Sequence, residues 1–268
     1  MTWISSLSAL SYPEIDPILF SIGPFAIRWY ALAYIAGLVI GWRLMIHFAK
    51  SPKSSISPAH IDDFLMWATL GVILGGRLGY VIFYKPEFYI ANPVEILKVW
   101  QGGMSFHGGF LGVVISAFLF CRKHKLPTLE LADMLATVAP IGLFFGRVAN
   151  FINGELFGRV SDAPWAMVFP NGGPLPRHPS QLYEAILEGL LLFLIIMIVR
   201  RTPFGSKPGV LSGLFLIGYA LARSFVELFR QPDAHLGFLI GGSTMGQLLS
   251  VPMILIGLLL IWHSARKS

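Results

Sequence analysis

The chain has 268 residues, of which 55% are hydrophobic and only 13% are charged, and its formal net charge is +6. This composition excludes an ordinary soluble domain and predicts a protein that crosses a membrane several times. The single cysteine, Cys121, excludes an intrachain disulfide and is expected to act as a small buried hydrophobe. No cluster of metal-ligating residues is evident in the sequence, so we expect no metal or organic cofactor.

Seven apolar segments are long enough to cross about 30 Å of hydrocarbon, which takes roughly 20 helical residues. They cover residues 25–45, 64–83, 103–121, 131–151, 182–199, 210–229 and 245–262. Residues 1–24 lack the basic flank, apolar core and cleavage site of a removable signal, so we interpret them as an interfacial arm. The sequence therefore predicts an all-α polytopic membrane protein that forms a single transmembrane domain over residues 1–268.

The loops predict the orientation, because Lys and Arg near the ends of spans are retained on the cytoplasmic side. Basic residues follow the first, third and fifth spans and end the chain: Arg43, Lys50 and Lys53; Arg122, Lys123 and Lys125; Arg200, Arg201 and Lys207; Arg266 and Lys267. Seven spans place all four groups on one side, so we expect the N-terminus outside and the C-terminus in the cytoplasm. The positive charge thus reflects topology, and it does not indicate nucleic-acid binding.

Two polar segments between the spans are expected on the external side. Residues 152–179 are too rich in Gly and Pro to span the membrane, and we interpret them as a small external head. Residues 85–101 contain Tyr89 and Trp100, and aromatic residues of this kind suit the depth of lipid headgroups. We therefore expect a second interfacial arm there.

Several ionisable residues lie near the predicted outer ends of the spans: Arg77, His107, Arg147, Arg223 and Arg230. Such groups at membrane depth normally face a partner or a water-filled cavity. Helical spacing puts Arg223, Glu227 and Arg230 on one face, and Glu184 and Glu188 on one face. We expect an outward cavity with excess positive charge, suited to an anionic ligand. For a single arginine such as Arg230, snorkelling to the interface is an equal alternative.

Glycines suggest close approaches within the bundle. Pairs with GxxxG spacing, such as Gly75/Gly79 and Gly108/Gly112, predict tightly packed helices. In the segment GGMSFHGG (102–109), glycines surround His107 and would let the backbone break or a ligand approach closely.

The stretch GRVANFINGELFG (146–158) resembles the signature of the bacterial prolipoprotein diacylglyceryl transferase family. Further segments that are similar to this family are RWY (28–30), FHGG (106–109), RHPSQLYE (177–184) and GYALARSFVELFRQPD (218–233). The resemblance covers nearly the whole chain. It implies a seven-helix enzyme of the bacterial plasma (inner) membrane that acts at the external face.

The implied reaction moves a diacylglyceryl group from phosphatidylglycerol to the lipobox cysteine of a prolipoprotein signal peptide and releases glycerol phosphate. On this basis we predict catalytic roles for His107, Arg147 and Arg223. The predicted substrate-binding residues are Tyr30, Arg77, Gly108, Gly109, Gly146, Asn150, Asn153, Glu155, Gly158, Tyr219 and Arg230.

The reaction suggests roles for these side chains. A thiol with a pKa of about 8.5 is mostly protonated at neutral pH, so His107 is the candidate base or positively charged neighbour. Arg147 and Arg223 can stabilise the charge that develops on the leaving phosphate. Asn150 and Glu155 would fix headgroup hydroxyls or hold an arginine. Two structural alternatives to these roles stay open. His107 could lie at a helix end with its ring bonded to a backbone carbonyl, and Glu155 could form an ion pair with Arg159.

Two other classes of protein fit the composition. A retinal-binding photoreceptor needs a lysine in the last span, and residues 245–262 contain none. A secondary transporter normally shows paired repeats and binding residues near the middle of the membrane. The charges here are displaced to one face, which suits lipid headgroup chemistry better, and an anion or lipid transporter is kept as the alternative.

Overall fold

The computed structural model describes residues 10–13, 15–23, 25–231 and 239–266. Among these residues, six helices are long and apolar enough to cross a membrane. They are α1 (Trp29–Ala49), α2 (Pro58–Tyr84), α4 (Phe106–His124), α5 (Thr128–Ile152), the continuous helix Ser180–Arg200, and α9 (Met245–Arg266). A shorter apolar helix, α8 (Val210–Val226), is the seventh. The chain is therefore a mostly helical, polytopic membrane protein, as predicted.

Two small sheets correct the expectation of an all-α fold. β1 (Leu10–Ser11) pairs in parallel with β4 (Met167–Val168), and β2 (Ile18–Ile22) pairs antiparallel with β3 (Phe25–Arg28). The first predicted span began at residue 25, but residues 25–28 pair with β2, so α1 begins at Trp29. α8 ends at Val226, three residues before the predicted end of that span.

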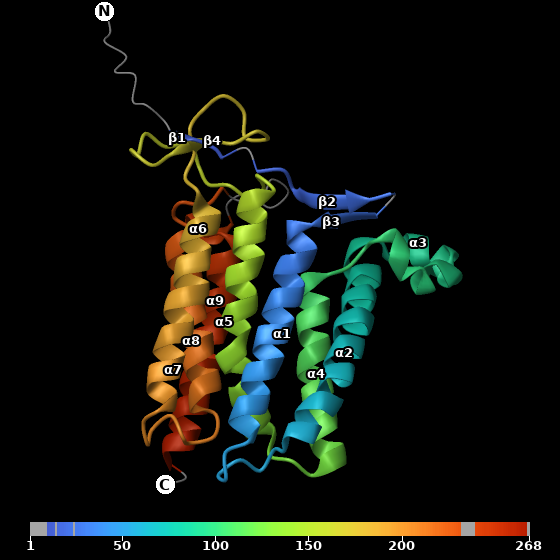
Figure 1. The fold of residues 1–268 in the computed structure, drawn as a ribbon, viewed down its shortest axis with the longest axis vertical. Helices are drawn as coiled ribbons and strands as arrows, with labels where there is room; N and C mark the ends of the chain where they lie inside the picture. The colour runs from blue at the N-terminus through green and yellow to red at the C-terminus, as the bar shows by residue number, and fades with distance from the viewer. Residues whose placement is uncertain (1–9, 14, 24, 232–238, 267–268) are drawn as a thin grey trace, which may run out of the picture. The chain divides into compact units, whose positions relative to one another are not determined.

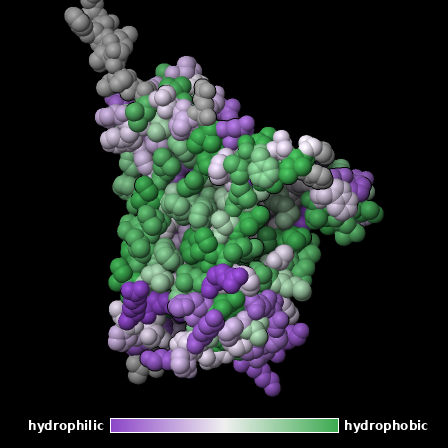
Figure 2. Space-filling model, viewed as in Figure 1, coloured by the Kyte–Doolittle hydropathy of each residue, from purple (hydrophilic) through white to green (hydrophobic). Residues whose placement is uncertain are grey.

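The chain divides into two compact units. One contains the described parts of Met1–Gly41 and Leu135–Ser268, and the other contains Trp42–Met134. Figure 2 shows hydrophobic side chains over the middle of the helices and hydrophilic residues near their ends. Many of the exposed side chains are large and apolar, such as Leu38 of α1, Leu70 of α2 and Leu259 of α9. Such a surface suits contact with lipid.

In the unit Trp42–Met134, α2 and α4 lie side by side (Figure 1). Their glycines face one another, so the two backbones touch. A Cβ on Gly79 would lie 2.8 Å from the Cα of Gly108, and a Cβ on Gly75 would overlap the carbonyl oxygen of Gly108. The close packing predicted from the GxxxG pairs is confirmed for these two helices.

The segment expected to be an interfacial arm follows α2. It consists of α3 (Pro86–Ala91) and two 3₁₀ turns, η1 (Pro93–Leu97) and η2 (Val99–Gln101). Its apolar side chains Ile90, Leu97 and Trp100 are more than 70% exposed. The arm is therefore an apolar surface built from short helices.

In the other unit, the fifth apolar helix is not α-helical throughout. It begins as α6 (Ser180–Glu184), continues as a π-helical stretch (Ala185–Leu191), and ends as α7 (Leu192–Arg200). A Cβ on Gly189 would lie 2.8 Å from the Cα of Phe144, so α5 approaches the π-helical stretch as closely as a glycine permits. α8 and α9 also pack through glycines, since a Cβ on Gly213 would lie 2.6 Å from the carbonyl oxygen of Gly257. Charged residues of α5, of the helix that begins as α6, and of α8 and the turn after it meet beside these approaches.

Candidate active site

Glu184, at the end of α6, contacts three arginines from two other parts of the chain. Its Oε1 accepts a hydrogen bond from Arg223 Nη1 of α8 at 2.6 Å and lies 3.6 Å from Arg230 Nη1. Its Oε2 lies 3.2 Å from Arg147 Nε of α5. The Glu184 side chain is fully buried. One carboxylate therefore joins all the arginines that the sequence predicted for the fourth and sixth spans.

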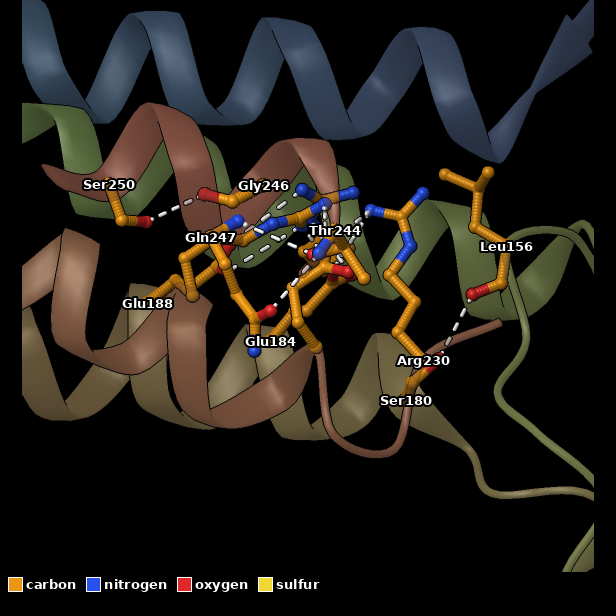
Figure 3. A network of polar contacts seen from close by, with 12 residues as sticks. Leu156, Ser180, Glu184, Glu188, Arg230, Thr244, Gly246, Gln247 and Ser250 are labelled. Carbon is orange, nitrogen blue, oxygen red and sulfur yellow. Dashed lines mark hydrogen bonds and ion pairs between the residues drawn. The ribbon is translucent and has the colours of Figure 1, made fainter. Parts of the chain in front are cut away.

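Two further glutamates complete this group, which we call the ion-pair network. Glu227 Oε1 lies 2.7 Å from Arg223 Nη2 and 3.9 Å from Arg230 Nη1, which confirms the face predicted from helical spacing. Glu188 lies 3.7 Å from Arg147 and 3.8 Å from Arg223. Figure 3 shows Glu184, Glu188 and Arg230 within this group. Neither Glu184 nor Glu188 was predicted as a site residue, although their shared helix face was a signal.

The formal charges of the network cancel. It contains Arg147, Arg223 and Arg230 opposite Glu184, Glu188 and Glu227, so the excess of positive charge expected from the sequence is not found within these six described residues. The arginine side chains are 10–18% exposed and the glutamates 0–5%. Removing one partner of a buried ion pair costs about 3–5 kcal/mol, because the other charge stays buried. The glutamates thus hold the arginines in fixed positions while the arginines keep some access to a ligand.

The start of α9 contacts the network through a glycine. A Cβ on Gly246 would lie 2.6 Å from Glu227 Oε1 and 3.0 Å from Arg223 Nε. Thr244 and Gln247 cap this helix reciprocally, since each backbone N–H donates to the side-chain oxygen of the other residue. Figure 3 shows Gly246 and Gln247 beside the glutamates. Gly246 was not predicted as a site residue. The Thr-x-x-Gln capping pattern, which predicts the start of a helix at this point, could have indicated it.

The signature residues after α5 form a compact turn. Glu155 Oε1 accepts hydrogen bonds from Asn150 Nδ2 at 2.8 Å and from Asn153 Nδ2 at 3.3 Å. The Glu155 backbone N–H donates to the carbonyl of Asn150, and Gly154 adopts a φ of +63° that favours glycine. The turn therefore presents the exposed Glu155 carboxylate with two amides fixed against it.

Arg159 and Gly158 tie the head to the end of α8. Arg159 Nε donates to the carbonyl of Arg230 at 2.8 Å, and its Nη2 donates to the carbonyl of Glu227 at 3.1 Å. A Cβ on Gly158 would lie 2.5 Å from the carbonyl oxygen of Phe229 and 2.7 Å from the Cβ of His178. Gly158 therefore allows close packing at this point, whereas a Cβ on Gly146 would meet nothing within 4 Å.

The tyrosines predicted for the site belong to this same unit. The hydroxyl of Tyr30, in the first turn of α1, lies 3.1 Å from the hydroxyl of Tyr34. Tyr219 of α8 packs against the core cluster formed by Leu192, Ile196 and Leu211. Both tyrosines are half-buried.

The other predicted residues lie in the unit Trp42–Met134. His107 is exposed in the first turn of α4, where Ser105 caps the helix by accepting from the Gly108 backbone N–H. Gly108 packs against Gly75, and Gly109 is buried. The convergence of His107 with the arginines remains a prediction.

Arg77 donates its hydrogen bonds to the arm. Its guanidinium is buried and bonds five backbone carbonyls: Glu95, Ile96, Lys98, Gly102 and Gly103. These bonds hold η1, η2 and the approach to α4 beside α2, which favours a structural role for Arg77. Among the residues described, no group of three His, Cys, Asp or Glu side chains could hold a metal ion.

The chain is similar to known proteins over nearly its whole length. The family model for prolipoprotein diacylglyceryl transferase matches residues 17–263. A phosphatidylglycerol–prolipoprotein diacylglyceryl transferase of Paramagnetospirillum magneticum is 60% identical over 261 residues, covering 97% of each chain. Relatives with the same name in Rhodospirillum rubrum and Allorhizobium ampelinum are 60% and 54% identical, and cover 98% and 99% of this chain and 96% of their own length. The family predicted from the sequence motifs is confirmed: the chain belongs to the prolipoprotein diacylglyceryl transferases.

Proposed function

We propose that this protein transfers the diacylglyceryl group of phosphatidylglycerol to the lipobox cysteine thiol of a prolipoprotein. The cysteine sulfur attacks carbon 3 of the diacylglyceryl glycerol, and the bond from that carbon to the phosphate oxygen breaks. A thioether forms, the thiol proton is released, and glycerol phosphate leaves. Family membership supports the transferase activity, and the names of the relatives supply both substrates.

The observation that carries this proposal is the pairing of Arg147 and Arg223 on the buried Glu184 carboxylate. The leaving phosphodiester becomes a monoester and gains charge in the transition state. Preorganised cationic donors in a site that excludes most water stabilise such charge strongly, and arginine is suited to phosphate because its donors form a planar fork. We assign Arg147 and Arg223 to the phosphate, with Arg230 supporting them.

The remaining residues are assigned around the headgroup and the thiol. Asn150, Asn153 and Glu155 form the turn that would fix the hydroxyls of the headgroup glycerol. His107 is the proposed acceptor of the thiol proton, because its imidazole is exposed in the first turn of α4. Tyr30 and Tyr219 are assigned to orient oxygen atoms of the substrate. Gly108, Gly109 and Gly158 are assigned to the backbone approaches that shape the site, and Gly146, where a Cβ would meet nothing within 4 Å, is assigned to leave room for the substrate.

We further propose that residues 1–268 act as one transmembrane catalytic domain in the bacterial inner membrane. The N-terminus, both interfacial arms and the head would lie on the external side, and the C-terminus would lie in the cytoplasm. The distribution of basic residues supports this orientation. The exposed apolar side chains of residues 85–101 support an arm that rests in the lipid interface.

The decisive experiment uses purified protein, phosphatidylglycerol with labelled acyl chains, and a peptide that contains a lipobox cysteine. The expected result is a mass increase of one diacylglyceryl group on the cysteine, with release of glycerol phosphate. A peptide in which serine replaces the lipobox cysteine is the control and should stay unmodified. Absence of the thioether together with lipid or anion counterflow in proteoliposomes would instead support the transporter alternative.

A further inference from the structure

Glu188 differs from the other glutamates of the ion-pair network. Its side chain is fully buried, yet neither of its carboxylate oxygens has a hydrogen-bond partner among the residues that the structure describes. Its nearest cationic atoms are Arg147 Nη2 at 3.7 Å and Arg223 Nη1 at 3.8 Å. A buried carboxylate without hydrogen bonds is costly, so the attraction of the two guanidiniums has to offset that cost.

The contrast with Glu184 suggests what this arrangement does. Glu184 occupies Arg223 Nη1 with a 2.6 Å hydrogen bond, and Glu227 lies 2.7 Å from Arg223 Nη2. Glu188 attracts Arg147 and Arg223 from beyond hydrogen-bond distance. Coulomb attraction falls slowly with distance, whereas a hydrogen bond requires close contact and alignment. Glu188 therefore neutralises and orients both guanidiniums without occupying their N–H donors.

Glu188 and Arg147 lie beside a close approach of two helices. Glu188 belongs to the π-helical stretch, and the adjacent Gly189 lies against Phe144 of α5, one helical turn before Arg147. A side chain at position 189 would approach both the backbone nitrogen and the Cα of Phe144 to 3.0 Å or less. The absence of a side chain at position 189 thus lets the π-helical stretch approach α5 closely beside the two charged residues.

We propose that Glu188 is a positioning residue for Arg147 and Arg223, which act on the phosphate; this inference rests on the proposed function. Its negative charge balances the network and directs the two guanidiniums, while their remaining donors stay available for the phosphate. Removing that charge leaves the network with one net positive charge. Anion binding in the ground state then strengthens, but the arginines lose the orientation that the transition state requires.

The test compares initial rates of thioether formation by wild-type protein and Glu188→Gln in phosphatidylglycerol micelles, with the lipobox peptide saturating. We expect the KM for phosphatidylglycerol to fall several-fold, and kcat to fall by about 10- to 100-fold, as for a displaced catalytic group. Added glycerol phosphate should inhibit Glu188→Gln at lower concentrations than wild type. The matched control is Glu130→Gln, because Glu130 accepts hydrogen bonds from Ser54 and Ser55 in the other unit and should affect neither constant.

Glu188→Asp provides a second variant in case Glu188→Gln does not accumulate. It keeps the charge but withdraws the carboxylate, so inhibition by glycerol phosphate should match wild type while kcat falls. An unchanged kcat in either variant, or a KM that rises in Glu188→Gln, would overturn the proposal. Failure of the wild-type protein to form any thioether would instead refute the proposed function, which keeps the two failures distinct.

Discussion

Arg223 Nη1 donates a 2.6 Å hydrogen bond to Glu184 Oε1, and this bond joins α8 to the end of α6. The same carboxylate lies 3.2 Å from Arg147 of α5, so one buried glutamate fixes two arginines from different helices. Arginines held in this way need little reorganisation when charge develops on a phosphate. The predictions for variants of Arg147 and Glu184 depend on this contact.

Arg147 should be far more important for turnover than Arg159, which lies in the same stretch of sequence. Losing one preorganised donor to developing charge lowers the rate by about 10²- to 10³-fold, so Arg147→Ala should show such a loss. Arg147→Lys should recover little, because an ammonium group cannot replace a planar fork. Turnover per folded molecule should be measured for both variants. Near-wild-type rates in both would contradict the assignment to the phosphate.

Arg159→Ala is the matched control for Arg147→Ala. Arg159 belongs to the segment 152–179 that was expected to form the external head, yet it is half-buried and donates to the carbonyls of Glu227 and Arg230. Hydrogen bonds from a charged group contribute about 1.5–3 kcal/mol each. Arg159→Ala should therefore lower the thermal stability while kcat per folded molecule stays near wild type. A loss of kcat that exceeds the loss in Arg147→Ala would reverse the assignment.

Glu184→Gln should strongly destabilise the protein. The change removes the carboxylate that contacts three arginines, and leaving buried charges without their partner costs about 3–5 kcal/mol. Thermal unfolding in detergent measures the effect, with Glu130→Gln as the control in the other unit. A Tm equal to that of wild type would show that Glu184 does not hold the network together.

The helices could be predicted from the sequence because each apolar segment is long enough to span the hydrocarbon layer. The hairpin of β2 and β3 could not be separated from the first span, since Phe25, Ala26 and Ile27 are as apolar as the helix that follows. The Gly23-Pro24 dipeptide was the one local turn signal.

The sequence predicted contacts of the site between residues close together in the chain, but not contacts between different helices. Helical spacing predicted Arg223, Glu227 and Arg230 on one face. The prediction holds although α8 ends at Val226, because the backbone N–H groups of Glu227 and Arg230 still bond the carbonyls four residues earlier. The contact of Arg147 with Glu184 depends on how α5 packs against another helix, which spacing does not encode. Likewise, spacing could not predict the hydrogen bonds of Arg77, because a segment that follows it by 18 to 26 residues folds over its guanidinium. Substrate binding by Arg77 stays a prediction.

Two glycines of the signature should respond differently to alanine. A Cβ on Gly158 would approach the carbonyl of Phe229 and the side chain of His178 within 2.7 Å, so Gly158→Ala should lower the Tm and the amount of protein in the membrane. A Cβ on Gly146 would meet nothing within 4 Å, so Gly146→Ala should fold normally. Thermal unfolding of both variants checks this difference. Equal losses of Tm in the two variants would show that close packing does not require a glycine at position 158.

Acidification should destabilise the head through His178. Burial lowers the pKa of His178 below its ordinary value of about 6.5, and Nδ1 lies 3.0 Å from the hydroxyl of Tyr183. The unfolded chain then takes up the proton at a higher pH than the folded protein. Stability is therefore constant above that ordinary value and is lost as the pH falls below it. The Tm should be measured between pH 7.5 and 5.

The control for this prediction is His178→Asn, which keeps a polar side chain but does not titrate in this range. Its Tm should be lower than that of wild type near neutral pH, because the ring contacts with Tyr183 and Phe229 are lost. Its decline on acidification should be shallower than that of wild type. Parallel declines in the two proteins would assign the pH dependence to other groups.

Cysteine labelling tests the proposed orientation, and the structure decides which positions to use. Cys121 is fully buried, so Cys121→Ala should retain activity and provide a background without reactive thiols. Gly172 is buried against Phe169 and Arg177, whereas the neighbouring Asn171 is exposed. Ser55 is exposed in the loop between α1 and α2, and only its backbone bonds Glu130. Asn171→Cys and Ser55→Cys therefore report on the head and on the first basic loop without disturbing side-chain contacts.

With an impermeant maleimide added to intact cells whose outer membrane is permeable to the reagent, Asn171→Cys should react at once. Ser55→Cys should react only after the plasma membrane is opened, because the basic residues around it are expected to hold that loop in the cytoplasm. Both variants should react in detergent, which confirms that each thiol is accessible. The reverse pattern would place Arg147 and Arg223 near the cytoplasmic face, where the proposed external transfer could not occur.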